Sequence, residues 1–101
     1  MTKQEKFEKA VEKNNIETVK KLLKNSEVDP AANDNYAIGM ASINGHIEIV
    51  RLLLNDVRVD PADMNNEAIR MASKKGHTEV VRLLLNDDRI NTAAVNNFAI
   101  I

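Results

Sequence analysis

The chain has 101 residues, which is enough for one domain. Hydrophobic residues make up 44% and charged residues 29%, values that are ordinary for a globular protein and argue against disorder. Acidic residues outnumber Lys and Arg by 15 to 14, and the net charge of -1 favours neither nucleic acid nor a membrane surface as a partner.

What the chain lacks narrows the possibilities further. Without cysteine it can form neither disulfides nor thiolate metal sites. Its apolar runs are far too short to span a bilayer. The N-terminal stretch MTKQEKFEKAVEK is charged throughout and has no signal-peptide character. We therefore expect a cytoplasmic protein that does not enter the membrane.

A period of 31 residues organises the chain. GHIEIVRLLLND at 45–56 and GHTEVVRLLLND at 76–87 agree at ten of twelve positions, and VDPA at 28–31 recurs at 59–62. Such a period indicates a stack of similar supersecondary units. We expect units at 1–27, 28–58 and 59–89, followed by a truncated unit at 90–101.

The first unit keeps only part of the apolar pattern. Phe7, Val19 and Leu22 match apolar residues of the second unit, whereas Lys6 and Lys21 replace Ala and Leu there. We expect the apolar set to face the second unit and the polar set, with Lys9 and Thr18, to form the outer face of an N-terminal capping repeat.

Each of the next two units predicts a pair of short helices. The first helices lie near 36–44 and 67–75, and the second near 47–55 and 78–86. Gly45 and Gly76 stand between them, where a residue with positive φ can end a helix. The connecting segment NDVRVDPADMNN is polar, contains a proline and is expected to be a loop. The fold class is therefore all-α.

YAIGMASINGHIEIVRLLL and EAIRMASKKGHTEVVRLLL resemble the ankyrin repeat, whose family pattern is TPLHLAAxxGHxEVVKLLL within about 33 residues. The resemblance covers almost the whole chain. It implies a single ankyrin-repeat solenoid of helix-turn-helix units, without catalytic activity, that binds another protein on the surface of its first helices and loops.

The chain departs from that family pattern in three ways. The TPLH motif is absent, and we expect Asn35, Asn66 and Asn97 to cap the first helices instead. The unit is two residues shorter, which favours a tight loop over a β-hairpin. No glycine follows the second helix, so a left-handed Asn25, or Asn55 with Asp56, is expected to close it.

No residue pattern points to catalysis, a metal or a cofactor. His46 and His77 lie in neighbouring units whose helices are ~8–10 Å apart, too far to share a zinc ion easily. Ser42 and Ser73 occupy small packing positions without a nearby base. The doublet Lys74-Lys75 is too small for a phosphate-binding surface, and a solvated helix end explains it.

Positions that differ freely between units are the candidate contacts. They are either partner-binding residues or unconstrained surface. The set comprises Asn35, Tyr36, Gly39, Ile43, Asn44, Met64, Asn66, Glu67, Arg70, Lys74 and Lys75, with Asn33, Asp34 and Asn65 beside them. Tyr36, Ile43 and Met64 are favoured, because exposed apolar or amphipathic groups are frequent contacts.

The C-terminal stretch VNNFAII at 95–101 aligns with MNNEAIR at 64–70, so it predicts the opening of a further first helix. Phe98, Ile100 and Ile101 would then be left for contact with another molecule. The sequence thus supports two functions. One is a non-catalytic protein-binding module, and the alternative is a structural fragment, natural or engineered, that self-associates through this end as a homo-oligomer.

Overall fold

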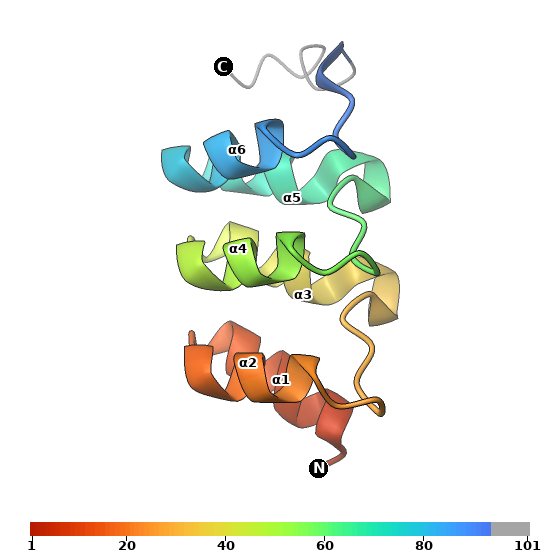
Figure 1. Cartoon of the computed structure of the whole chain (residues 1–101). Helices are drawn as coiled ribbons and strands as arrows, with labels where there is room; N and C mark the ends of the chain where they lie inside the picture. Colours follow the sequence, from red (N-terminus) through yellow and green to blue (C-terminus); the bar gives the residue numbers. More distant parts are fainter. Residues whose placement is uncertain (94–101) are drawn as a thin grey trace.

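The computed structural model describes residues 1–93, which form six α-helices in three stacked pairs (Figure 1). The pairs are α1 (Lys3–Glu12) with α2 (Ile16–Leu23), α3 (Ala32–Ile43) with α4 (Ile47–Leu54), and α5 (Asp63–Lys74) with α6 (Thr78–Leu85). Helix α3 packs between α1 and α5, and α4 packs between α2 and α6. These residues contain no strand, which confirms the all-α repeat fold and the tight loops in place of hairpins.

One apolar core runs along the whole stack, from Phe7 in α1 to Ile90 beyond α6. Phe7, Ile38 and Ile69 share one phase of the repeat and are almost fully buried. Lys6 and Lys21 of the first unit are exposed, as expected of an outer polar face.

The first helix of each unit begins in one of two ways. Helix α1 has a capping box, in which Thr2 Oγ1 accepts from Glu5 N at 3.0 Å and Glu5 Oε1 accepts from Thr2 N at 2.8 Å. Helices α3 and α5 instead open with three residues in the left-handed region, at 33–35 and 64–66. This conformation costs ~1–2 kcal/mol for most residues, and Asn and Asp tolerate it best after glycine. The runs Asn-Asp-Asn and Met-Asn-Asn are largely suited to it.

The predicted capping role of Asn35 and Asn66 is wrong, because neither α3 nor α5 has a side-chain cap. Asn35 Oδ1 accepts from the N–H of Asp60 at 2.8 Å, and its Nδ2 donates to Asp63 at 2.8 Å. Its side chain therefore ties the second unit to the loop that enters the third. Asn97 lies outside the described residues.

The predicted left-handed ends of the second helices are also wrong. Asn25, Asn55 and Asp56 have no positive φ. Carbonyls at these helix ends instead accept from arginines of the corresponding loop one unit later: Arg58 donates to Leu23 O at 3.2 Å, and Arg89 donates to Leu54 O at 2.5 Å. A guanidinium at this end also suits the helix dipole.

The turn between paired helices follows the prediction. Gly45 and Gly76 have φ of 70° and 80°, and Asn14 takes the same position in the first unit with φ of 59°. The next residue in the later units is a histidine. His46 Nε2 lies 3.1 Å from Glu12 O and His77 Nε2 lies 3.1 Å from Ile43 O, so each donates to the backbone of the preceding unit. Both histidines are therefore structural, as the sequence indicated.

Candidate protein-binding groove

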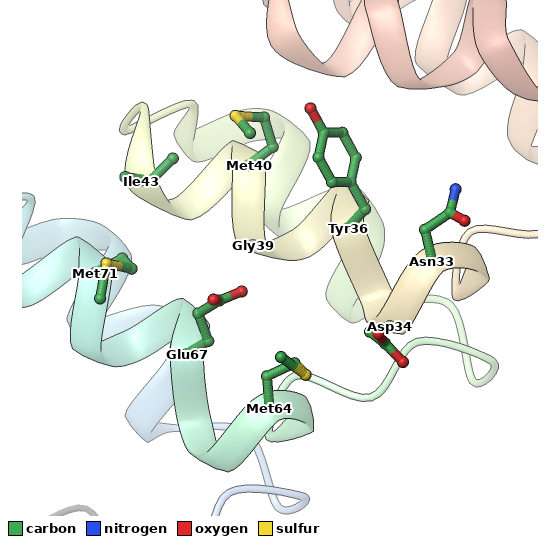
Figure 2. A pocket seen from close by; sticks show the side chains of 9 residues that line it. All are labelled: Asn33, Asp34, Tyr36, Gly39, Met40, Ile43, Met64, Glu67 and Met71. Atoms are coloured by element: carbon green, nitrogen blue, oxygen red, sulfur yellow. The ribbon is translucent and has the colours of Figure 1, made fainter.

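A hollow of about 350 Å³ lies between α3 and α5, and we call it the α3–α5 groove. Figure 2 shows α3 forming one wall and α5 the other. Nine residues line it: Asn33, Asp34, Tyr36, Gly39, Met40, Ile43, Met64, Glu67 and Met71.

Apolar side chains line both walls of this groove. Met40 and Ile43 follow Tyr36 along one face of α3, at four and seven residues. Met71 and Met64 lie on α5, and Met64 is 50% exposed. Unbranched thioether side chains adapt to partners of different shape, which is why they are frequent on protein-binding surfaces.

Gly39 keeps the middle of the groove open. A Cβ built on Gly39 would lie 3.4 Å from Glu67 Oε1 across the groove. The corresponding residues in the other units are Glu8 and Arg70, whose side chains are long. Glycine in a helix interior costs about 0.5–1 kcal/mol relative to alanine. In return, the absence of a side chain at Gly39 leaves open space in the middle of the groove.

Tyr36 bounds the groove on the side of the first unit. Its hydroxyl points toward α1 (Figure 2) and donates to Glu12 Oε2 at 2.6 Å. This hydrogen bond, together with burial and the nearby carboxylates, raises the pKa of Tyr36 to about 12. The Tyr36 ring is therefore held in place by this hydrogen bond and stays uncharged where it borders the groove.

The charge of the groove is negative. Asp34 and Glu67 line it, and no Lys or Arg does. Almost every other acidic residue of the chain is engaged, with a side-chain or backbone donor. Within residues 1–93, the only side-chain carboxylates that make no hydrogen bond or ion pair are those of Asp34, Glu67 and Asp88. Two of these three carboxylates thus face the same hollow.

The groove gathers five of the eleven predicted contacts: Tyr36, Gly39, Ile43, Met64 and Glu67. Asn44, Lys74 and Lys75 are exposed but lie outside its lining.

Three of the predicted contacts have structural roles. Asn35 and Asn66 are 7% and 6% exposed, which corrects their place among the surface contacts. Arg70 donates to the carbonyls of Asn65 and Met64 at 2.9 and 3.1 Å, so it supports the left-handed turn of α5.

Sequence reasoning missed Met40 and Met71. Both share the phase of Lys9, which the sequence assigns to the polar outer face of the first unit, and an apolar residue at that phase in a later unit indicates a core contact between units. They are only half-buried and reach the groove. The signal in the sequence was their identity, since methionine recurs where a tightly packed core position more often has a branched aliphatic residue.

Other site predictions concern residues away from the groove. Within residues 1–93 no group of three or more His, Asp or Glu could hold a metal ion. In the same part of the chain no helix has the length and apolar character needed to cross a membrane. Phe98, Ile100 and Ile101 lie outside the described residues, and their role in self-association stays a prediction.

A family model for ankyrin repeats (three copies) matches residues 7–96, most of the chain. The chain belongs to the ankyrin repeat family. No curated protein and no solved structure matched this ankyrin-repeat chain in the same comparisons. Ankyrin repeats are generally protein–protein interaction modules, and the family is typically non-catalytic. The stacked pairs of short helices and the turn glycines are the structural form of that family pattern here.

Proposed function

We propose that this ankyrin-repeat chain is a non-catalytic, cytoplasmic module that binds another protein in the α3–α5 groove. The observation that supports this most is the hollow of about 350 Å³ between two first helices, lined by the exposed Met64 and by half-buried thioether, aliphatic and aromatic groups. Solvent-accessible apolar groups gathered in one concave place are typical of contact surfaces, whereas single ones are ordinary.

The rest of the chain adds to this proposal. The two walls of the groove are helices held by their neighbours: α3 packs against α1, α4 and α5, and α5 packs against α3 and α6. We therefore infer that they present a preorganised surface. Rigid surfaces lose little conformational entropy on binding. Tyr36 and Ile43 are the expected anchors, because aromatic and apolar groups in partly enclosed positions dominate binding energy.

A binding comparison tests the proposal. The wild-type chain is used to capture a partner, which is then identified and purified. The affinity of this partner is measured for wild type and for the double variant Tyr36→Ala/Ile43→Ala. We expect a loss of about tenfold or more. Val57→Ala is the matched control, because Val57 is 93% exposed in a loop away from the groove. Circular dichroism checks that the double variant is folded. If the folded double variant binds the partner with unchanged affinity, the binding surface lies outside the groove.

A further inference from the structure

We propose that the α3–α5 groove selects a cationic segment of its partner, one that inserts a Lys or Arg next to an apolar side chain. This inference rests on the proposed function and adds the chemistry of the partner.

The first support is the pair of unengaged carboxylates. Asp34 stands in the left-handed turn of α3, and Glu67 in the first right-handed turn of α5. Figure 2 shows the Glu67 carboxylate directed toward α3 across the groove, with Asp34 at the same end as Met64. Both carboxylates are exposed and make no bond that an incoming cation would have to break.

The second support is the shape and composition around these carboxylates. The absence of a side chain at Gly39 leaves room within reach of Glu67 Oε1. Met40 and Met71 offer apolar surface on either side. Lys and Arg have aliphatic stems that cover such surface while the charged head stays near water or a carboxylate. A Lys or Arg side chain therefore matches both the apolar surface and the carboxylates of the groove, which an acidic or a purely apolar side chain does not.

The nearest basic side chain on α5 does not already provide this charge. Arg70 follows Glu67 by three residues, but its guanidinium donates to the carbonyls of Asn65 and Met64. It is not among the residues that line the groove. The negative charge of the groove is thus left to be matched by a partner.

The chain itself supplies a variant that blocks the groove. Gly39→Arg introduces the residue that the third unit has at this phase, and the new side chain would begin with a Cβ 3.4 Å from Glu67 Oε1, inside the groove. A random twelve-residue peptide library displayed on phage is selected in parallel on wild type and on Gly39→Arg. Circular dichroism confirms that both are folded. Peptides retained by wild type and lost on Gly39→Arg are the groove binders. We expect them to carry Lys or Arg beside Leu, Ile, Met or Phe more often than the unselected library.

Affinities then test the carboxylates one at a time. The best groove peptide is synthesised with a fluorescent label, and its binding is followed by anisotropy. Asp34→Asn and Glu67→Gln should each weaken binding about two- to fivefold, the size of an exposed ion pair. Asp88→Asn is the matched control, because it removes the unengaged carboxylate that lies outside the groove, and its affinity should equal that of wild type.

The outcomes separate the two proposals. Groove binders without an excess of basic residues, or affinities unaffected by Asp34→Asn and Glu67→Gln, would overturn the cationic segment and leave the protein-binding groove standing. If no peptide distinguishes wild type from Gly39→Arg, the groove is not a peptide-binding surface and both proposals fall.

Discussion

Arg89 offers the sharpest test of what holds one unit to the next. Its guanidinium donates to three backbone carbonyls of the preceding unit and its loop, those of Leu54, Asp56 and Val59, at 2.5, 3.2 and 2.6 Å. Asp87 fixes it with an ion pair of 2.7 Å, and the arginine side chain is only 31% exposed. Arg89→Gln removes the charge and the fork of donors together.

The expected cost follows from those contacts. A hydrogen bond from a charged donor contributes about 1.5–3 kcal/mol, and the partial exposure of the site places each of these at or below the lower limit. Losing three, with water replacing some of them, should lower the free energy of unfolding by about 2–3 kcal/mol. Arg89→Lys keeps the charge but cannot span three carbonyls, so it should recover less than half of that loss.

Urea unfolding followed by circular dichroism measures these differences. Arg82→Gln is the matched control, because Arg82 makes only an exposed ion pair with Glu79 at 2.7 Å on the surface of α6. Such pairs contribute about 0.2–1 kcal/mol. If Arg89→Gln costs no more than Arg82→Gln, the carbonyl contacts do not stabilise the stack and the reasoning fails.

Three further results are expected from the same unfolding assay. Asn35→Ala should cost about 1 kcal/mol more than Asn66→Ala, because Asn35 bonds the next loop through both side-chain atoms whereas Asn66 Oδ1 is buried without a partner; equal costs would contradict this. Ser42→Ala should stabilise the chain by roughly 1 kcal/mol, since Ser42 Oγ is buried without a hydrogen bond, and a loss of stability would show an unrecognised bond. The pKa values of Asp56 and Asp87 lie below the ordinary 3.8, chiefly because Arg58 and Arg89 donate to them. The stabilisation that these two ionised carboxylates give the folded state is therefore complete above about pH 4 and is lost as pH falls through the lowered pKa values. An acid titration in which this stabilisation is lost near neutral pH would refute the assignment.

The stack itself could be predicted from the sequence because its causes repeat. Each unit must bury the same helix faces, so apolar residues recur every 31 positions, and the turn that needs a positive φ recurs as Gly45 and Gly76. Aligning the units with one another, together with the known preference of glycine for such turns, was sufficient for these features.

The features that sequence reasoning missed are contacts between units. Asn35 was expected to act within its own helix, but its side chain reaches Asp60, 25 residues later. Arg58 and Arg89 are visible as a repeated Asp-x-Arg pattern. Their acceptors are main-chain carbonyls about 30 residues earlier, which no residue type marks. The groove was half predicted, because the variable positions were visible but the half-buried methionines resembled core residues.

The direction of the links between units has a consequence for how such chains change over time. The histidine and the arginine of one unit both donate to carbonyls of the unit before it. Every residue has a carbonyl, so the accepting unit needs no matching side chain. These particular links can therefore persist when a unit is duplicated or exchanged, without compensating substitutions at the accepting positions. The surface residues of α3 and α5 are then free to diverge toward whatever they bind.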